Sequence, residues 1–128
     1  MSLTPDIAYR TVSVQVATPD GVMFVHVVEN EQGYPIQVLI NIGKSGSNLA
    51  AWADAIARLV TRLLPHIGVT GVIEEVSGIT SSQLRQRENG EVTRSGPEGL
   101  AIALLKYSAE WYRVNQPKLR PGGPSIER

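Results

Sequence analysis

The residues best suited to chemistry lie in one short segment, Asn41–Asn48, which reads NIGKSGSN. Glycines and serines around a lysine are typical of a backbone that turns sharply and exposes its N–H groups. An amphipathic stretch follows, so these groups would lie beside the unpaired amides and the positive dipole end of a helix. The segment therefore predicts an anion-binding loop, with Lys44 as a point charge and Ser45 or Ser47 as hydroxyl donors. Its expected ligand-binding residues are Gly43, Lys44, Ser45, Gly46, Ser47 and Asn48.

The segment is not a Walker A loop. That motif needs a glycine five positions before the Gly-Lys pair, and Val38 occupies this place within a predicted strand. No convincing aspartate for a magnesium ion follows an apolar strand either, so nucleotide hydrolysis is not expected. A purely structural interpretation stays open, in which the glycines form a tight turn and Ser47 or Asn48 caps the helix.

A second polar cluster carries arginines on a predicted hairpin with its tip at Asn89-Gly90. Arginine forks pair well with phosphates and carboxylates, so this arm is expected to close over an anion bound at the lysine loop. The expected ligand-binding arginines are Arg85, Arg87 and Arg94. Three glutamates lie nearby, so an internally paired, solvated hairpin is the alternative. These are Glu88, Glu91 and Glu98.

Catalytic and metal-binding constellations are not evident. His26 lies in an otherwise apolar strand with no nucleophile or carboxylate obviously arranged around it, so a core or interface histidine is expected rather than a catalytic base. His26 and His66 do not have the helical spacing of a metal-binding pair. The chain has no cysteine, which removes disulfides, thiolate nucleophiles and cysteine zinc sites. The expectation is a protein that is not an enzyme and has no cofactor and no metal.

Composition narrows the class of protein. A chain of 128 residues has the size of one domain, and its zero net charge argues against general nucleic-acid binding. No apolar run reaches the length of a membrane span, and Met1–Arg10 lacks the apolar core of a signal peptide. The expected location is the cytoplasm, or the host cytoplasm if the chain is viral.

The elements that must position these residues begin with strands. Alternating apolar residues predict strands over Thr11–Thr18 and Pro35–Ile42. Between them, Val22–Glu29 is expected to be a strand that is apolar on both faces except for His26. Turn residues at Pro19-Asp20-Gly21 and Asn30–Tyr34 would join them into an antiparallel meander.

Helical periodicity follows. Apolar spacings of three and four predict a helix over Asn48–Leu64, ended by Pro65 and Gly68, with one or two more turns over Thr70–Ser77. A last helix would start at the N-cap Ser95, with Glu98 three residues later. Core packing is the expected role of both tryptophans, although either could reach an interface between subunits. These are Trp52 and Trp111.

The expected architecture is α+β with two layers, an antiparallel meander with the two main helices packed on one face. The domain would span residues 10–115, between an extension over 1–9 and a flexible Pro/Gly-rich tail over 116–128. Self-association into a homodimer or higher oligomer is expected, because the last helix's stripe extends beyond what three strands can cover. The stripe residues are Tyr107, Trp111 and Val114.

With these motifs in place, the chain resembles the TSCPD domain. This small module is found at the C-terminal end of cobalamin-dependent ribonucleotide reductases and as a stand-alone protein, often in phages. The similarity covers roughly Thr18–Tyr107. Its matching pieces are Pro19-Asp20-Gly21, Val38–Leu64, Glu74–Thr80 (EEVSGIT) and Ser95–Leu104 (SGPEGLAIAL).

The chain departs from the family where the family has cysteines. In the naming motif a cysteine precedes the proline and the acid, whereas here Gly96 precedes Pro97 and Glu98. The Gly-Ile segment, often followed by cysteine in relatives, continues as Thr80-Ser81-Ser82. Thiol-exchange and metal roles therefore do not carry over. The resemblance implies a stand-alone, cysteine-free form of the domain and allows a phage origin.

Two functions are expected from these observations. The first is a non-catalytic binding protein for an anionic, nucleotide-derived small molecule. It would sequester its ligand as viral anti-defence sponges such as the Thoeris anti-defence proteins do, by an analogy of size and layout alone. The alternative is an accessory module, related to the C-terminal domain of cobalamin-dependent ribonucleotide reductase, that docks on a reductase or another protein.

Overall fold

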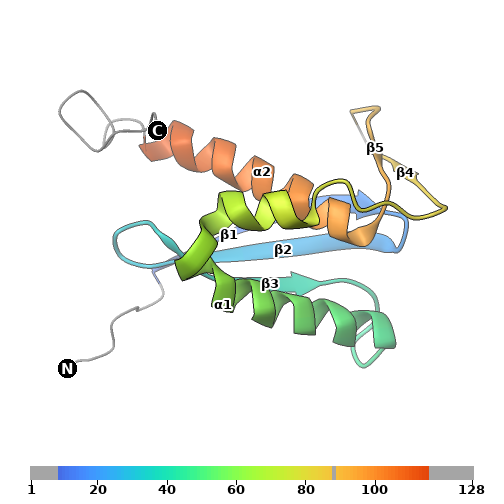
Figure 1. Cartoon of the computed structure of the whole chain (residues 1–128), viewed down its shortest axis with the longest axis horizontal. Helices are drawn as coiled ribbons and strands as arrows, with labels where there is room; N and C mark the ends of the chain where they lie inside the picture. The colour runs from blue at the N-terminus through green and yellow to red at the C-terminus, as the bar shows by residue number, and fades with distance from the viewer. Residues whose placement is uncertain (1–8, 88, 116–128) are drawn as a thin grey trace.

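The computed structural model describes residues 9–87 and 89–115. A three-stranded antiparallel sheet is followed by a long kinked helix, a two-stranded hairpin and a second long helix (Figure 1). The predicted α+β meander with two main helices is confirmed. Apart from Tyr9, the extension expected over residues 1–9 and the tail expected over 116–128 lie outside the described residues.

The sheet has the order β1 (Arg10–Thr18), β2 (Gly21–Glu29) and β3 (Pro35–Asn41). The two-residue turn after Thr18 pairs this residue with Gly21, and the same register places Ser13 opposite His26. The connection from β2 to β3 is longer, and the register shifts between Val28 and Glu29 before it.

The two faces of the sheet differ in character. One face packs against the helices and supplies fully buried valines to the core, namely Val16, Val25, Val27 and Val38. The other face carries polar side chains from all three strands, together with partly exposed Phe24 and Leu39. Burial of a single face explains the alternation that made the strands readable from the sequence.

Helix α1 (Asn48–Val76) joins the two helical segments that the sequence predicted, across a kink. Pro65 lies inside it, and the break falls at Gly68, where φ is 68° and ψ is 178°. The proline lacks an N–H that could donate to the carbonyl of Thr61, but hydrogen bonds to β3 hold the helix at Thr61. The hydroxyl of Thr61 donates to the carbonyl of Val38 at 3.2 Å and accepts from its N–H at 3.0 Å. The predicted end at Pro65 was therefore wrong, whereas the predicted end at Gly68 and the further helical turns after it are confirmed.

The two arms of α1 take different directions (Figure 1). The first arm runs along β3, and the second lies beside α2 over the sheet. The first arm approaches the sheet through small side chains, because Ala53 and Ala57 are buried while Trp52 is 71% exposed. The predicted core role of Trp52 was wrong. Its exposure leaves an interface between subunits as its expected role.

Helix α2 (Gly96–Asn115) starts as predicted. The hydroxyl of Ser95 accepts the N–H of Glu98 at 3.0 Å, which is an N-cap bond. The carboxylate of Glu98 does not complete a capping box with Ser95, because it accepts the N–H of Arg94 at 2.8 Å instead. The preceding hairpin, β4 (Arg85–Gln86) and β5 (Val92–Thr93), has the predicted Asn89-Gly90 tip.

Within the described residues, one helix is long and apolar enough to cross a membrane by length and composition alone. An 18-residue window of α1 has a mean hydropathy of 1.3. Core helices of globular proteins meet the same criterion, and α1 packs along β3. The expectation of a chain without a membrane partner stays a prediction.

Replacing Gly68 with alanine should destabilise the protein by about 1–3 kcal/mol, because its dihedral angles lie in a region that is essentially restricted to glycine. A Cβ at this position would meet no atom within 4 Å, so backbone strain alone causes the loss. Urea unfolding measures the effect. Thr70→Ala, at an exposed helical position nearby, is the control and should change stability by less than about 0.5 kcal/mol. Equal stability of Gly68→Ala and the unmodified protein would contradict this account of the kink.

Candidate functional site

The loop between β3 and α1 is a tight turn followed by a helix cap. The N–H of Ser47 donates to the carbonyl of Lys44 at 3.0 Å, and Gly46, the third residue of this turn, has a φ of 83°. The hydroxyl of Ser47 accepts the N–H of Ala50 at 3.1 Å, so Ser47 is the N-cap. The structural role that the sequence left open for Ser47 is confirmed.

Other groups of the same loop remain free. Within the described part of the chain, the N–H groups of Lys44, Ser45 and Gly46 donate to no protein acceptor, and the ammonium group of Lys44 pairs with no carboxylate. The first turn of α1 contains no acidic residue, so nothing there offsets the positive end of the helix dipole. The loop can therefore still accept a negative charge.

A cavity of about 510 Å³ lies against this loop. Its walls come from the loop glycines and serines, from the end of β3 and from the first turns of α1. Asp54 also lines it, and this carboxylate is paired with Nε of Arg58 at 3.0 Å. The cavity is thus lined by polar and apolar groups in similar measure, with one carboxylate that already has a cationic partner.

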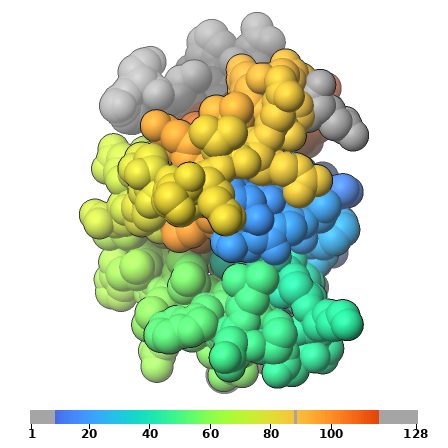
Figure 2. Space-filling view, turned by 90° about the vertical axis from the view of Figure 1, so that its right-hand side faces the viewer, coloured from blue at the N-terminus to red at the C-terminus, as the bar shows by residue number. Residues whose placement is uncertain are grey.

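Of the predicted binding residues, the loop cavity is lined by Gly43, Ser45, Gly46 and Ser47, and not by Lys44, Asn48 or the three arginines. Figure 2 shows the hairpin and the loop at the same end of the molecule, with the β1–β2 turn between them. Arg87 pairs with Glu91 at 2.6 Å, and Arg94 pairs with Glu98 at 2.6 Å. Arg85 lies on β4 and is exposed. The pairing within the hairpin agrees with the alternative that the sequence left open, and the structure does not bring these arginines to Lys44.

The Arg94–Glu98 pair joins this hairpin to α2. Glu98 is 8% exposed and accepts from both the backbone N–H and the guanidinium of Arg94. Hydrogen bonding by Arg94 lowers the pKa of the Glu98 carboxyl, against the opposing effect of burial. Glu98 therefore stays ionised and fixes the hairpin to the first turn of α2.

A row of polar side chains lies on the open face of the sheet and was not predicted from the sequence. Ser13 Oγ lies 2.7 Å from Nδ1 of His26, and Nε2 of His26 lies 2.9 Å from Oδ1 of Asn41. If Nε2 carries the proton and donates to Asn41, Nδ1 is left to accept from Ser13. Acyl transfer also requires free N–H donors aimed at an oxyanion. Strand β2, which carries His26, pairs with β1 on one side and with β3 on the other. The row orders Asn41, which lines the loop cavity.

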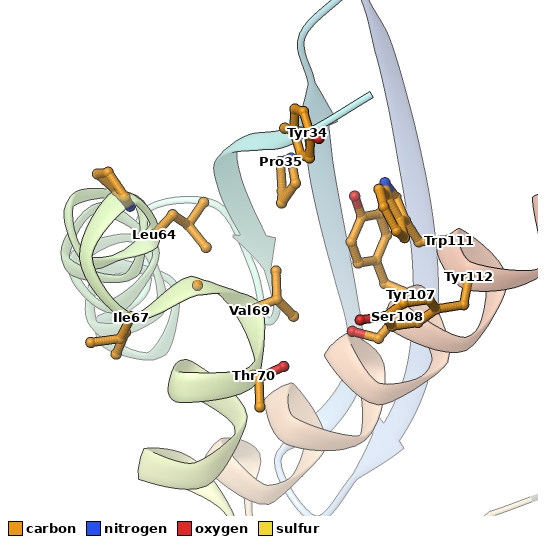
Figure 3. A pocket seen from close by; sticks show the side chains of 12 residues that line it. Tyr34, Pro35, Leu64, Ile67, Val69, Thr70, Tyr107, Ser108, Trp111 and Tyr112 are labelled. Atoms are coloured by element: carbon orange, nitrogen blue, oxygen red, sulfur yellow. The ribbon is translucent and has the colours of Figure 1, made fainter. Parts of the chain in front are cut away.

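A second feature was also missed, an apolar cleft of about 430 Å³ at the far end of the sheet (Figure 3). Tyr34 comes from the β2–β3 connection, Trp111 and Tyr112 come from α2, and Val69 and Thr70 come from α1 just after the kink. Trp111 is fixed by a hydrogen bond from Nε1 to the carbonyl of Gly33 at 2.6 Å. The break of α1 at Gly68 shapes this cleft, and no periodic pattern in the sequence indicates it.

A buried carboxylate lies next to the cleft. Glu29 is 2% exposed and accepts from the hydroxyl of Tyr107 at 2.6 Å and from Nε of Arg10 at 2.9 Å. Burial, together with the neighbouring carboxylate, raises the pKa of Tyr107 far above its usual range. This hydrogen-bonded set joins α2 to the sheet and explains why Tyr107 is buried rather than available to a second subunit.

The loop and the cleft are too far apart to bind one small molecule within one chain. They lie at opposite ends of β3, which has seven residues. At about 3.3 Å per residue the separation is about 20 Å. Each is therefore a separate candidate site.

A family model described as the TSCPD domain matches residues 4–108. The chain belongs to the TSCPD domain family. It is thereby related to the C-terminal region of ribonucleotide reductase. No curated protein and no solved structure matches the chain.

In this TSCPD domain, Gly96, which precedes Pro97 and Glu98, is buried. A Cβ at Gly96 would lie 3.2 Å from Oδ2 of Asp20, so a larger side chain there would crowd the β1–β2 turn. Among residues 9–87 and 89–115, no group of three His, Cys, Asp or Glu side chains could hold a metal ion. The expectation that the protein has no metal or cofactor stays a prediction.

Exchanging Glu98 for glutamine should destabilise the domain by about 1 kcal/mol at pH 7, since it removes the charge that binds Arg94 while solvent screens the half-exposed guanidinium. Because the folded-state pKa of Glu98 is lowered, its contribution is complete above the unfolded pKa and is lost as the pH falls through the folded pKa. The difference in unfolding free energy between the two proteins should therefore be constant above about pH 5 and shrink below it.

The matched control is Glu110→Gln, which removes the exposed pair with Arg113 and should leave stability almost unchanged. Chemical unfolding at several pH values measures both variants. A Glu98→Gln difference that persists unchanged at pH 2 would contradict the assigned role of this carboxylate.

Proposed function

We propose that this TSCPD domain is a non-catalytic binding protein for an anionic, nucleotide-derived small molecule, held at the Gly43–Ser47 loop. The observation that carries the proposal is the set of three backbone N–H groups without a protein acceptor, at Lys44, Ser45 and Gly46, beside a helix N-terminus. A phosphate group would accept from these amides and from Lys44.

The size of the loop cavity and the family of the chain both support a nucleotide-derived ligand. The loop cavity of about 510 Å³ has room for more than a single phosphate group. The relation to ribonucleotide reductase, an enzyme that acts on ribonucleotides, favours a nucleotide-derived ligand. Binding without turnover agrees with the state of the reactive side chains that line this cavity among the described residues: Ser45 and Ser47 have no histidine among the lining residues, and the carboxylate of Asp54 is paired with Arg58. Sequestration of a host immune nucleotide by a viral protein is a setting that such a function would fit.

Lys44→Ala should abolish the thermal stabilisation given by a bound nucleotide while leaving the ligand-free melting temperature almost unchanged, because Lys44 is exposed and unpaired. The measurement is a thermal-shift screen of nucleotides and cyclic nucleotides, in which a ligand at about 100 times its dissociation constant adds about 2.7 kcal/mol. Arg62→Ala, an exposed cation on α1, is the control and should keep the shift. A shift that survives Lys44→Ala, or no shift with any compound, contradicts the proposal.

We also propose that the protein self-associates, through α1 rather than through the end of α2. Tyr107 is buried and Trp111 is hydrogen-bonded within the chain, whereas Trp52, Leu59 and Leu63 are 71%, 65% and 40% exposed. The spacing of seven and four residues puts these three side chains on one stripe of α1. A twofold axis would pack the stripe against its own copy.

Leu59→Asp should convert the dimer or higher oligomer into a monomer, because it places a charge in the middle of the stripe. Gel filtration with light scattering measures the mass. Leu105→Asp, at a 53% exposed position of α2, is the control and should leave the oligomer intact. A wild-type protein that is monomeric at high concentration would contradict self-association and favour the alternative function, a module whose apolar stripe docks on a reductase or another protein.

A further inference from the structure

The guanidinium of Arg87 is buried with unsatisfied donors. Its side chain is only 11% exposed, and Nη2 bonds Oε1 of Glu91 at 2.6 Å. Within the described residues, Nε and Nη1 of Arg87 are shielded from solvent and have no hydrogen-bond partner. A guanidinium does not lose its proton in proteins, so donors left this way are unfavourable. The hairpin therefore holds a cation that lacks part of its complement of acceptors.

A cavity of about 340 Å³ lies on one side of this guanidinium. Gln15 and Ala17 of β1, Asn89 of the hairpin tip and Lys106 of α2 line it together with Arg87. Two cations thus face one space, and none of the described residues that line it is acidic. A separate cavity, also lined by Arg87, contains the carboxylates of Glu91 and Glu98. Among the described residues, the carboxylates next to Arg87 therefore line that cavity and not the one shared with Lys106.

We propose that this space, the Arg87–Lys106 cavity, binds the phosphate group of a small molecule. Phosphate oxygens would accept from Arg87 and from the ammonium group of Lys106. The site shares no lining residue with the loop cavity and is separated from it by the β1–β2 turn. It is therefore independent of the proposed function at Lys44.

The test is an amide NMR titration of the full chain with inorganic pyrophosphate at constant ionic strength. We expect the N–H signals of Gln15, Ala17 and Asn89 to shift and saturate together, and Lys106→Gln to weaken this binding at least tenfold. Arg87→Gln should have the same effect. Because Lys106 is exposed on a helix, its variant decides the question even if Arg87→Gln does not fold.

Two control variants test whether the effect is specific to this cavity. Arg85→Gln removes an exposed arginine from the same hairpin and should leave the affinity unchanged. Lys44→Ala should also leave the signals near Arg87 unchanged, so failure of the loop site and failure of this site are distinguishable. No saturable shift at these amides, an affinity unaffected by Lys106→Gln, or an equal loss in Arg85→Gln would overturn the proposal, the last because it would indicate diffuse attraction by surface charge.

Discussion

The close packing of α1 on β3 is the constraint on which the candidate site depends. Ala53 and Ala57 bring the helix near the sheet, and the hydroxyl of Thr61 ties it to both backbone groups of Val38. The chain must therefore leave β3 and enter α1 within the six residues from Ile42 to Ser47. Such a short reversal uses left-handed glycines, at Gly43 and Gly46, and leaves the N–H groups between them pointing away from the protein's own acceptors. The chemistry of the loop follows from this packing.

The same packing decides which apolar residues are left outside. A helix that contacts the sheet through alanines cannot also bury a tryptophan one residue away, so Trp52 is exposed while Ala53 is buried. The break at Gly68 then redirects the second arm of α1 towards α2 and opens the aromatic cleft beside Trp111. One close contact and one glycine thus determine both the exposed stripe and the cleft.

Much of the fold could be predicted because the signals are local. Alternation along the strands, the Pro19-Asp20 turn and the Ser95 cap each depend on a few neighbouring residues, and each is found in the structure. The exit from β3 was equally readable, since Ser47 caps the helix as one of the two interpretations expected. The predictions that failed required knowledge of distant partners. Pro65 stays helical beside a Thr61 that is anchored to β3, and periodicity alone could not tell which apolar stripe of α1 faces the sheet.

The same distinction between local signals and distant partners applies to the functional side chains. The lysine loop is contiguous in sequence and was found, whereas the Ser13–His26–Asn41 row is assembled across three strands. The two-residue turn that pairs Thr18 with Gly21 does place Ser13 opposite His26, so this half of the row could have been derived. The arginines were found, but their separation from Lys44 depends on the β1–β2 turn that lies between them (Figure 2).

Hydrogen exchange at the N–H groups of Lys44, Ser45 and Gly46 tests the central claim most directly, since exchange reports whether an amide has an acceptor. The account predicts rapid, unprotected exchange of all three in the ligand-free protein and strong protection once a nucleotide is bound. Protection of these amides in the ligand-free protein, or no change on saturation with a nucleotide that binds, would contradict it.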